Sequence, residues 1–403
     1  MEDTKNNQSN GLLYHIQKGN NLLSDMSDYK NQKNSIVRFL NNQFQNKKLN
    51  IFIGSGCSTP TIPLMGATIK TILQNDDNAN IKERIKDYIE IQNRNLLPEN
   101  ILKLDCFSDI EGFLSWLSKG IDFEKDEKVK CKYRKIYNSL KRQFINTIPK
   151  VGDEKYTDTQ TLGFYENFYK YVFDKRKEDF PKLNIFTTNY DLFNEYALEN
   201  HKIHYTTGFN VGLGQSFNIN CFNHRIVDSR ERYKDKWQPT LKEANVYKLH
   251  GSINWIEKSG ILTHSNNPND DIEQVLIYPT ILKHHETRQS PYSELFREFS
   301  IQLQKTNSTL IMLGYGFGDD HINNIILQNL TNSDFTLVVF GDIEEEGLKK
   351  FSKINSGINF HIIGGSVENL DSNGSKELIK AHYFSEIVSH FCVDNNQEGD
   401  SNE

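Results

Sequence analysis

Short apolar runs rich in β-branched residues alternate with longer amphipathic stretches along most of the chain, and this alternation limits the possible folds. Runs of about five such residues, ended by glycine or polar residues, are typical of buried strands. The predicted strands are Leu49–Ile53, Asn184–Thr187, Val246–Leu249, Gln274–Ile277, Thr309–Leu313, Thr336–Phe340 and Asn359–Ile363. The predicted helices between them include Ser35–Lys47, Asp191–Glu199, Tyr292–Gln304 and His321–Asn329. This order predicts parallel βαβ units, and therefore an α/β fold with a doubly wound, Rossmann-like parallel sheet.

The 403 residues divide into three predicted regions. Residues 1–34 are mostly polar and are expected to form a loosely ordered N-terminal extension. Residues 35–390 are expected to form the main domain, with an inserted helical subdomain over about 70–182, where the sequence is highly charged and helical in pattern. The acidic end, 391–403, is predicted to be a disordered tail. The aromatic residues of the insert are interpreted as core, with an oligomer or partner surface as the alternative.

Composition excludes several classes of protein. No apolar run reaches the roughly 18 residues of a membrane-spanning helix, and the polar N-terminus lacks the apolar core of a secretory signal. The five cysteines include no C-x-x-C pair, so neither a zinc ribbon nor a redox dithiol is expected. A cytoplasmic location is expected. The formal net charge of −6 argues against a surface built throughout for nucleic acid, although a local basic patch remains possible.

Polar and glycine-rich loops follow several of the predicted strands, where a doubly wound sheet binds its ligands. Gly54–Ser58 (GSGCS) follows the first strand and is either a phosphate-binding loop or a plain tight turn. Thr187–Asp191 (TTNYD) follows the second strand, with Asn189 placed to hold a hydroxyl or a water. Asp191 either orients its neighbours or only caps the helix that follows.

Two further loops complete the set. His250 ends a predicted buried strand and stands beside Gly251, which makes it a candidate general base, although a structural histidine is an equal alternative. Gly314–His321 (GYGFGDDH) has three alternate glycines that can form the floor of a ligand site. Asp319 or Asp320 is expected to cap the following helix, and no metal site is expected there.

The ordered set of loops resembles the sirtuin-like NAD-binding superfamily, particularly its branch of bacterial NAD hydrolases in antiphage defence. The resemblance covers about residues 35–390 and rests on Gly54–Ser58, Thr188–Asp191, His250-Gly251, Gly314–Phe317 and Asp109–Glu111 before a helix. Deacylating sirtuins carry a four-cysteine zinc ribbon after the His-Gly pair and an I-P-D-F-R run after the first loop. This chain has no such cysteines and keeps only Ile62-Pro63 of the run, so deacylation is not expected.

The resemblance implies a regulated NAD⁺ glycohydrolase that cleaves NAD⁺ to nicotinamide and ADP-ribose and depletes it during infection. The alternative is a non-hydrolytic NAD-sensing or ADP-ribose-sensing scaffold subunit. Implied partners are further copies of the chain and a HerA-type hexameric ATPase, and nucleic-acid binding by the chain alone is not expected.

Residue roles follow from the same resemblance. Asn189, His250 and Asp191 are the predicted catalytic residues. The residues predicted to bind NAD⁺ are Gly54, Ser55, Gly56, Ser58, Pro63, Thr188, Gly314, Gly316, Phe317 and Asp342. Within that set, the backbone of Gly54–Ser58 is assigned to the pyrophosphate, with the hydroxyls of Ser55 and Ser58 as side-chain donors, and Asp342 is assigned to the ribose of the adenosine.

Overall fold

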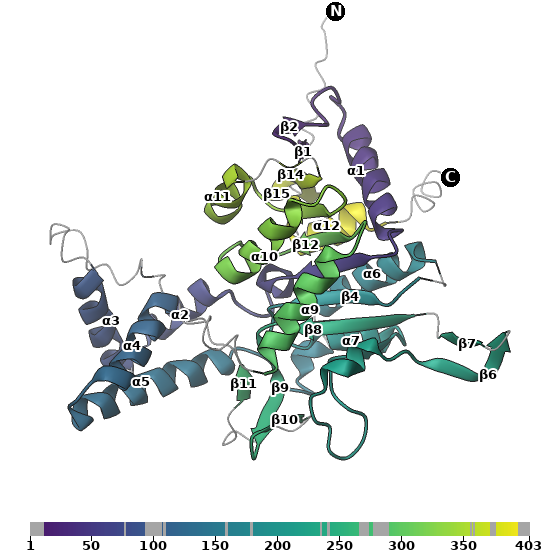
Figure 1. Ribbon diagram of the computed structural model, residues 1–403. Coiled ribbons are helices and arrows are strands. Elements are labelled where there is room, and N and C mark those ends of the chain that lie inside the picture. Colours follow the sequence, from purple (N-terminus) through teal and green to yellow (C-terminus); the bar gives the residue numbers. More distant parts are fainter. Residues whose placement is uncertain are drawn as a thin grey trace, which may run out of the picture.

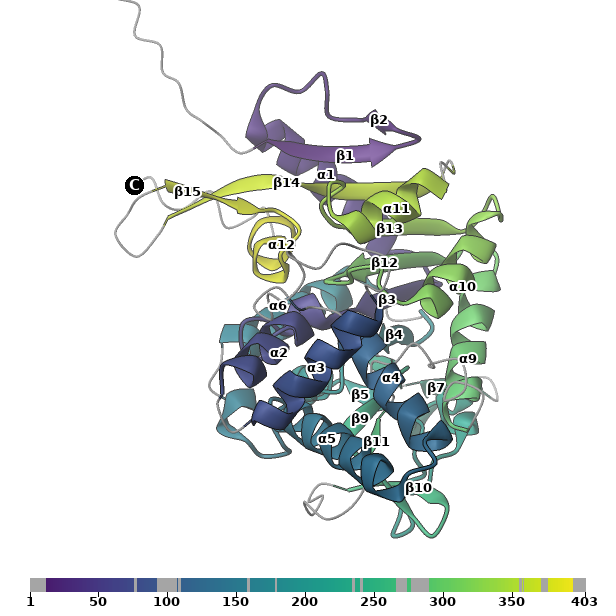
Figure 2. The ribbon, with the colours of Figure 1, turned by 90° about the vertical axis from the view of Figure 1, so that its left-hand side faces the viewer.

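The computed structural model describes most of the chain between Leu12 and Val393 and is shown in two views in Figures 1 and 2. The described residues are 12–75, 78–92, 107, 110–157, 160–177, 180–233, 236–239, 242–265, 274–276, 290–354, 357, 359–370 and 376–393. Asp109 of the resemblance and most of the predicted acidic tail lie outside them.

A doubly wound, mostly parallel sheet forms the centre of the molecule, as the sequence predicts (Figure 1). Its parallel strands are β3 (Leu49–Ile53), β4 (Leu183–Thr187), β5 (His204–Thr206), β8 (Glu243–Lys248), β12 (Thr309–Leu313), β13 (Thr336–Phe340) and β14 (Phe360–Leu370). They lie in the order β14-β13-β12-β3-β4-β8-β5. The chain winds from β3 towards β8 and later from β12 towards β14. The switch point, where such sheets bind ligands, therefore lies between β3 and β12.

Helices cover both faces of this sheet. One face is covered by α1 (Tyr29–Phe44), α6 (Gln160–Lys175), α7 (Phe193–Asn200) and α12 (Phe384–Phe391). The other is covered by α9 (Tyr292–Gln304), α10 (Asp320–Leu330) and α11 (Glu346–Ile354). Side chains alternate along each strand, so Ile51 and Ile53 pack in the first core and Phe52 in the second. Burial of each such side chain contributes about 1.5–3 kcal/mol, which fixes the register of the strands.

The helical insert packs around a separate hydrophobic core (Figure 2). It consists of α2 (Met65–Gln74), α3 (Ala79–Gln92), α4 (Ile110–Phe123) and α5 (Glu127–Ile145). Ile69, Phe113 and Leu140 are among its fully buried side chains, whereas Phe123 is largely exposed. The prediction of an insert reaching residue 182 is too long, because Tyr165 and Phe168 of α6 pack in the core of the main sheet.

Several short strands outside the parallel sheet lie near β8. A hairpin of β6 (Val227–Tyr233) and β7 (Lys236–Pro239) precedes β8, and the 3-10 turns η5 (Glu154–Tyr156) and η6 (Ile219–Asn223) connect neighbouring elements. A three-stranded antiparallel sheet contains β9 (Gly251–Lys258), β10 (Ile261–His264) and β11 (Gln274–Leu276). The segment predicted as a strand from Gln274 therefore pairs with β9 and does not belong to the parallel sheet.

The N-terminal segment also departs from the prediction. Leu13–Gln17 forms β1, which pairs antiparallel with β14, continues into β2 (Asn20–Asn21) and adds an edge to the main sheet. β15 (Lys376–Lys380) also pairs with β14. The polar composition of the segment concealed this strand, in which Leu13 and His15 are buried and Tyr14 and Ile16 pack, partly buried, against the second core. Among the described helices, none combines the length and apolar character that a membrane span requires.

Candidate functional site

Two glycine loops meet at the switch point of the sheet, backbone against backbone. The amide of Gly54 donates to the Leu313 carbonyl at 2.8 Å, and the amide of Gly56 donates to the Gly314 carbonyl at 2.9 Å. A Cβ on Gly54 would lie 2.3 Å from the Gly314 oxygen. Gly314 has a φ of +61°, which favours glycine. Glycine is thus required at these positions because the ends of β3 and β12 approach so closely.

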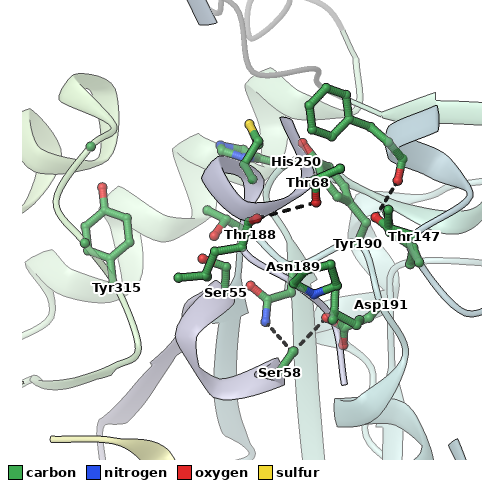
Figure 3. Close-up of a pocket in the computed structure, with 18 of the residues that line it drawn as sticks. Ser55, Ser58, Thr68, Thr147, Thr188, Asn189, Tyr190, Asp191, His250 and Tyr315 are labelled. Carbon is green, nitrogen blue, oxygen red and sulfur yellow. Dashed lines mark hydrogen bonds between the residues drawn. The ribbon is translucent and has the colours of Figure 1, made fainter. Parts of the chain in front are cut away.

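A cavity of about 350 Å³ opens beside this contact, between the carboxyl ends of the strands and the helical insert (Figure 3). Its polar wall comes from the strand ends and contains Ser55, Ser58, Thr188, Asn189, Tyr190, Asp191, His250, Tyr315, Gly316, Gly318 and Asp319. Its other wall is mainly apolar and contains Ile62, Pro63, Leu64, Met65, Thr68, Phe144, Ile145, Thr147 and Ile148. No lysine or arginine is among the described residues that line it. Any anionic ligand there must be held by neutral donors.

Ser58 lies at the centre of a buried hydrogen-bond network, between the end of β3 and the loop after β4 (Figure 3). Its hydroxyl donates to Asp191 Oδ2 at 2.8 Å and accepts from Asn189 Nδ2 at 3.0 Å. Because the one hydroxyl proton of Ser58 goes to Asp191, the Tyr165 hydroxyl at 3.0 Å donates to it. Ser58 is therefore unavailable as the predicted donor to a pyrophosphate and instead fixes the two side chains beside it.

The carboxamide of Asn189 is held on one side and left available on the other. Its Nδ2 also donates to the Gly54 carbonyl at 3.0 Å, while the backbone amide of Asn189 donates to Thr187 Oγ1 at 3.0 Å. Its Oδ1 is buried and has no hydrogen-bond partner within the described protein. Because a buried acceptor without a partner is costly, this oxygen suits a hydroxyl or a water brought into the cavity.

The N-cap position of α7 belongs to Leu192, and Asp191 bonds to its neighbours through both carboxylate oxygens. Its Oδ1 accepts from the Phe193 amide at 3.1 Å, which supports the start of α7, and its Oδ2 orients Ser58. Burial raises the pKa of the Asp191 carboxyl, while the nearby Lys248 lowers it. Lys248 is fully buried, and its ammonium contacts Glu195 Oε1 at 3.1 Å and donates to the Asp191 carbonyl. A single buried cation thus opposes the pKa rise of two buried carboxyls, those of Asp191 and Glu195.

His250 follows β8 and reaches Asp319 across the cavity mouth. Its Nε2 lies 3.2 Å from Asp319 Oδ2, and both side chains are nearly buried. Asp319 also caps α10, because its Oδ1 accepts from the amides of His321 and Ile322 at 2.9 and 3.2 Å. The contact places one nitrogen of the imidazole beside a carboxylate, and His250 also lines the cavity. The imidazole is therefore oriented for proton transfer.

Other predicted residues shape the site through the backbone or lie away from it. The amides of Gly54, Gly56 and Cys57 already donate within the protein, so these three cannot hold a pyrophosphate. Phe317 has a left-handed φ of +57° that turns its ring away from the cavity and into the core against Phe351.

Asp342 does not line the cavity. Its Oδ2 pairs with Lys380 at 2.6 Å, and this interaction lowers the pKa of its carboxyl. The described structure therefore places Gly54, Gly56, Gly314, Phe317 and Asp342 around or beyond the cavity. Ser55, Ser58, Pro63, Thr188, Asn189, Asp191, His250 and Gly316 are brought to its walls.

Sequence reasoning missed the residues that act from behind the cavity. Lys248 stands two residues before His250 at the end of a buried strand, and a charged residue in that position is a signal that could have been followed. Asp319 was considered only as a helix cap, and its second contact depends on the fold. Tyr165 carries no local signal, because an aromatic residue on an amphipathic helix predicts core.

Groups of three or more potential metal-ligating side chains do not occur among the described residues. A family model described as a SIR2-like domain matches residues 183–353, which is less than half of the chain. The matched stretch contains the loop after β4, His250 and the loop after β12, but not Gly54–Ser58. No curated protein matches the chain. The match supports a sirtuin-like family and suggests an NAD-related function.

Proposed function

We propose that this chain is an NAD⁺ glycohydrolase that releases nicotinamide and ADP-ribose. The observation that carries the proposal is the pairing of an unpartnered Asn189 Oδ1 with the His250–Asp319 contact in one cavity. Both lie within the stretch that is similar to SIR2-like domains. A site that supplies one fixed acceptor and one oriented base suits the attack of water on a ribose carbon.

The chemistry needs little acid catalysis. The nicotinamide of NAD⁺ is already cationic, so its departure requires no proton, and the transition state resembles an oxocarbenium ion as in glycoside hydrolysis. Asn189 Oδ1 accepts a hydrogen bond from a ribose hydroxyl or from the attacking water. His250 accepts the proton that the water loses. Asp319 is a positioning residue, since it acts only through His250, and Asp191 positions Asn189 through Ser58.

Substrate binding falls to the two walls of the cavity. Ser55 and Thr188 offer hydroxyl donors to phosphate oxygens without a cation, replacing the backbone amides and Ser58 as the principal donors. Ile62, Pro63 and Ile148 on the insert side suit a flat aromatic ring. A cavity of about 350 Å³ lies within the range of ligand sites, roughly 300–1,000 Å³.

The biological setting follows from the same resemblance. We place the hydrolase in the cytoplasm, where its activity during phage infection depletes NAD⁺. An enzyme that destroys an essential cofactor must be restrained, so we include control by self-assembly and by a HerA-type ATPase partner. The helical insert is the natural place for such control, because α2 and α5 supply part of the cavity wall.

The test is to incubate purified protein with NAD⁺, alone and with the ATPase, and to quantify nicotinamide and ADP-ribose. General-base catalysis is typically worth about 10²–10⁴-fold, so Asn189→Ala and His250→Ala should each lower turnover by about that factor. Asn42→Ala and His204→Ala change exposed residues of the same two types; they are the matched controls and should retain wild-type turnover. Folded Asn189 and His250 variants with wild-type turnover would show the site to be wrong. NAD⁺ binding without product, with or without the partner, would favour a sensing or scaffold subunit.

A further inference from the structure

The edge of the sheet opposite the cavity carries a row of cations. Lys48, Lys182 and Lys242 stand immediately before β3, β4 and β8, so each marks the amino-terminal end of a strand. Neighbouring strands lie about 4.8 Å apart, and the pairing of Asn50 with Asn184 puts the first two lysines level. The formal net charge of the whole chain is −6, so this local group of positive charges cannot be inferred from the composition.

A small pocket of about 60 Å³ lies among these cations, beside β4 and β8. Five cationic side chains line it: Arg176, Lys177, Lys182, Arg225 and Lys242. The single carboxylate in its lining, Glu243, is buried and already accepts from Arg225 Nε at 2.7 Å and from the Ile226 amide at 2.8 Å. The described lining therefore has a strong excess of positive charge.

Contacts around the pocket show which cations are structural and which face solvent. Arg176 donates to the carbonyls of Asn46 and Pro181, and burial lowers its pKa to about 10. Lys177 and Lys242 are exposed, and Lys242 has only a 3.5 Å contact with exposed Asp174. Glu178 and Asp179 follow Lys177 in the sequence and lie outside the described residues.

The row continues beyond the pocket on both sides. Lys47 and Arg176 both lie over the Phe180 ring, 5.8 and 5.3 Å from its centroid, and because Phe180 lines the pocket, Lys47 is next to it. Lys305, in the connection before β12, is exposed and close enough to Lys48 for the two charges to interact. A single small anion would need only the pocket, whereas a row along several strand ends suits an extended polyanion.

The β6–β7 hairpin adds an aromatic side chain to the same edge. Glu243, the first residue of β8, holds Arg225 and Ile226 at the base of the hairpin, which projects on the side away from the helical insert (Figure 1). Trp237 on β7 is 48% exposed, and its neighbour Lys236 is also exposed. An exposed indole on a hairpin whose base is held at the pocket offers a surface on which a base can stack.

We propose that the amino-terminal edge of the sheet and the β6–β7 hairpin bind single-stranded nucleic acid without sequence preference. The exposed lysines of the row contact backbone phosphates, and Trp237 stacks on a base, whereas Lys48 donates to Thr306 and Lys182 to the Phe222 carbonyl and Asn245. The exposed tryptophan favours a nucleic acid over an acidic protein segment, and an unpaired strand is the form that presents its base faces. The proposal departs from the expectation that the chain alone does not bind nucleic acid, and it is independent of the proposed hydrolase activity.

The test uses the full chain and labelled single-stranded DNA and RNA of mixed sequence, followed by fluorescence anisotropy over a range of salt concentrations. Lys177→Glu/Lys242→Glu removes two phosphate contacts, so the slope of log K against log salt should fall in magnitude by about 1.4, at roughly 0.7 per contact. Trp237→Ala should weaken binding by at least about 5-fold, the lower end of one lost stacking contact.

Lys119→Glu/Lys350→Glu is the matched control, since it makes the same charge change on the insert and on α11 and should leave binding as in the wild type. NAD⁺ hydrolysis, where detected, should be unaffected by these substitutions. Absence of binding at low salt would overturn the proposal. So would binding that the control weakens as much as the test variant. Displacement of the oligonucleotide by an equal charge of polyglutamate, with Trp237→Ala unchanged, would assign the edge to an acidic protein instead.

Discussion

Removing the buried ammonium of Lys248 should lower the free energy of unfolding, and its effect on activity tests whether this charge supports the site. The side chain is fully buried, contacts Glu195 Oε1 at 3.1 Å and donates to the Asp191 carbonyl. Lys248→Met keeps the length and apolar stem of the side chain but leaves Glu195 as an uncompensated buried acid. Breaking a buried pair in this way costs about 3–5 kcal/mol of unfolding free energy.

The double variant separates the charge from the packing. Lys248→Met/Glu195→Leu replaces both partners with apolar groups, which is often neutral or stabilising. We therefore expect it to recover most of the stability that Lys248→Met loses, with the difference read as a coupling energy in a double-mutant cycle. Activity should not recover, because Lys248 lowers the pKa of the Asp191 carboxyl, and its loss favours the protonated form, which accepts a weaker hydrogen bond from Ser58 than the carboxylate does.

The pH dependence gives an independent check on the same pair. Burial already raises the pKa of Glu195, and Lys248 opposes that shift, so Lys248→Met should raise the pKa of Glu195 further. A carboxyl whose folded pKa exceeds its unfolded pKa stabilises the fold below the unfolded value and loses that contribution as pH rises. The stability difference from wild type, measured by urea unfolding, should thus be smallest in acid and grow towards neutrality. A difference below about 1 kcal/mol at neutral pH, or one unaffected by pH, would refute the ion-pair account, since a broken buried pair should cost several times more.

Three further predictions concern other parts of the structure. Gly54→Ala should lower the unfolding free energy by about 1–3 kcal/mol, because its Cβ would meet a carbonyl oxygen at 2.3 Å; Gly66→Ala, with open space around it, should not. His15 and His361 form a buried 3.0 Å pair, and burial lowers the pKa of each to about 4. The unfolded chain therefore binds more protons between about pH 6.5 and 4, so urea unfolding should show stability falling as pH drops through that window, less so in His361→Gln. Asp342→Ala should leave the KM for NAD⁺ unchanged, whereas a tenfold rise would restore its predicted contact with the ribose.

Elements with a strong local pattern could be predicted from the sequence almost to the residue. Leu49–Ile53, Thr309–Leu313 and Thr336–Phe340 are confirmed as strands with these bounds, and Tyr292–Gln304 as a helix. In each case a buried apolar run or a single amphipathic face decides the structure locally. β1 could not be predicted, because its stability comes from pairing with β14, more than 340 residues later.

The walls of the cavity were predictable to a similar degree, and the contacts behind them were not. Parallel strands place their carboxyl ends at one edge, so the loops containing Asn189 and His250 had to lie near each other once the sheet was assigned. The local sequence marks Ser58 as part of the glycine loop, but its bonds to both Asn189 and Asp191 arise only when β3 and β4 are paired. Its hydroxyl proton is committed to Asp191, so the motif residue that looks most like a phosphate donor is the one that positions the others.

Ser58 also explains why the site tolerates a buried acid beside the cavity. Asp191 is buried, and burial raises the pKa of its carboxyl. The Ser58 hydroxyl, the Phe193 amide and the charge of Lys248 each favour the carboxylate and lower its pKa. Of these, Ser58 is the one that also contacts Asn189, so the same hydroxyl favours the Asp191 carboxylate and helps to orient the Asn189 carboxamide. The geometry therefore couples the charge of Asp191, behind the cavity, to the orientation of Asn189, whose Oδ1 faces the substrate. This coupling requires residues from the ends of both β3 and β4.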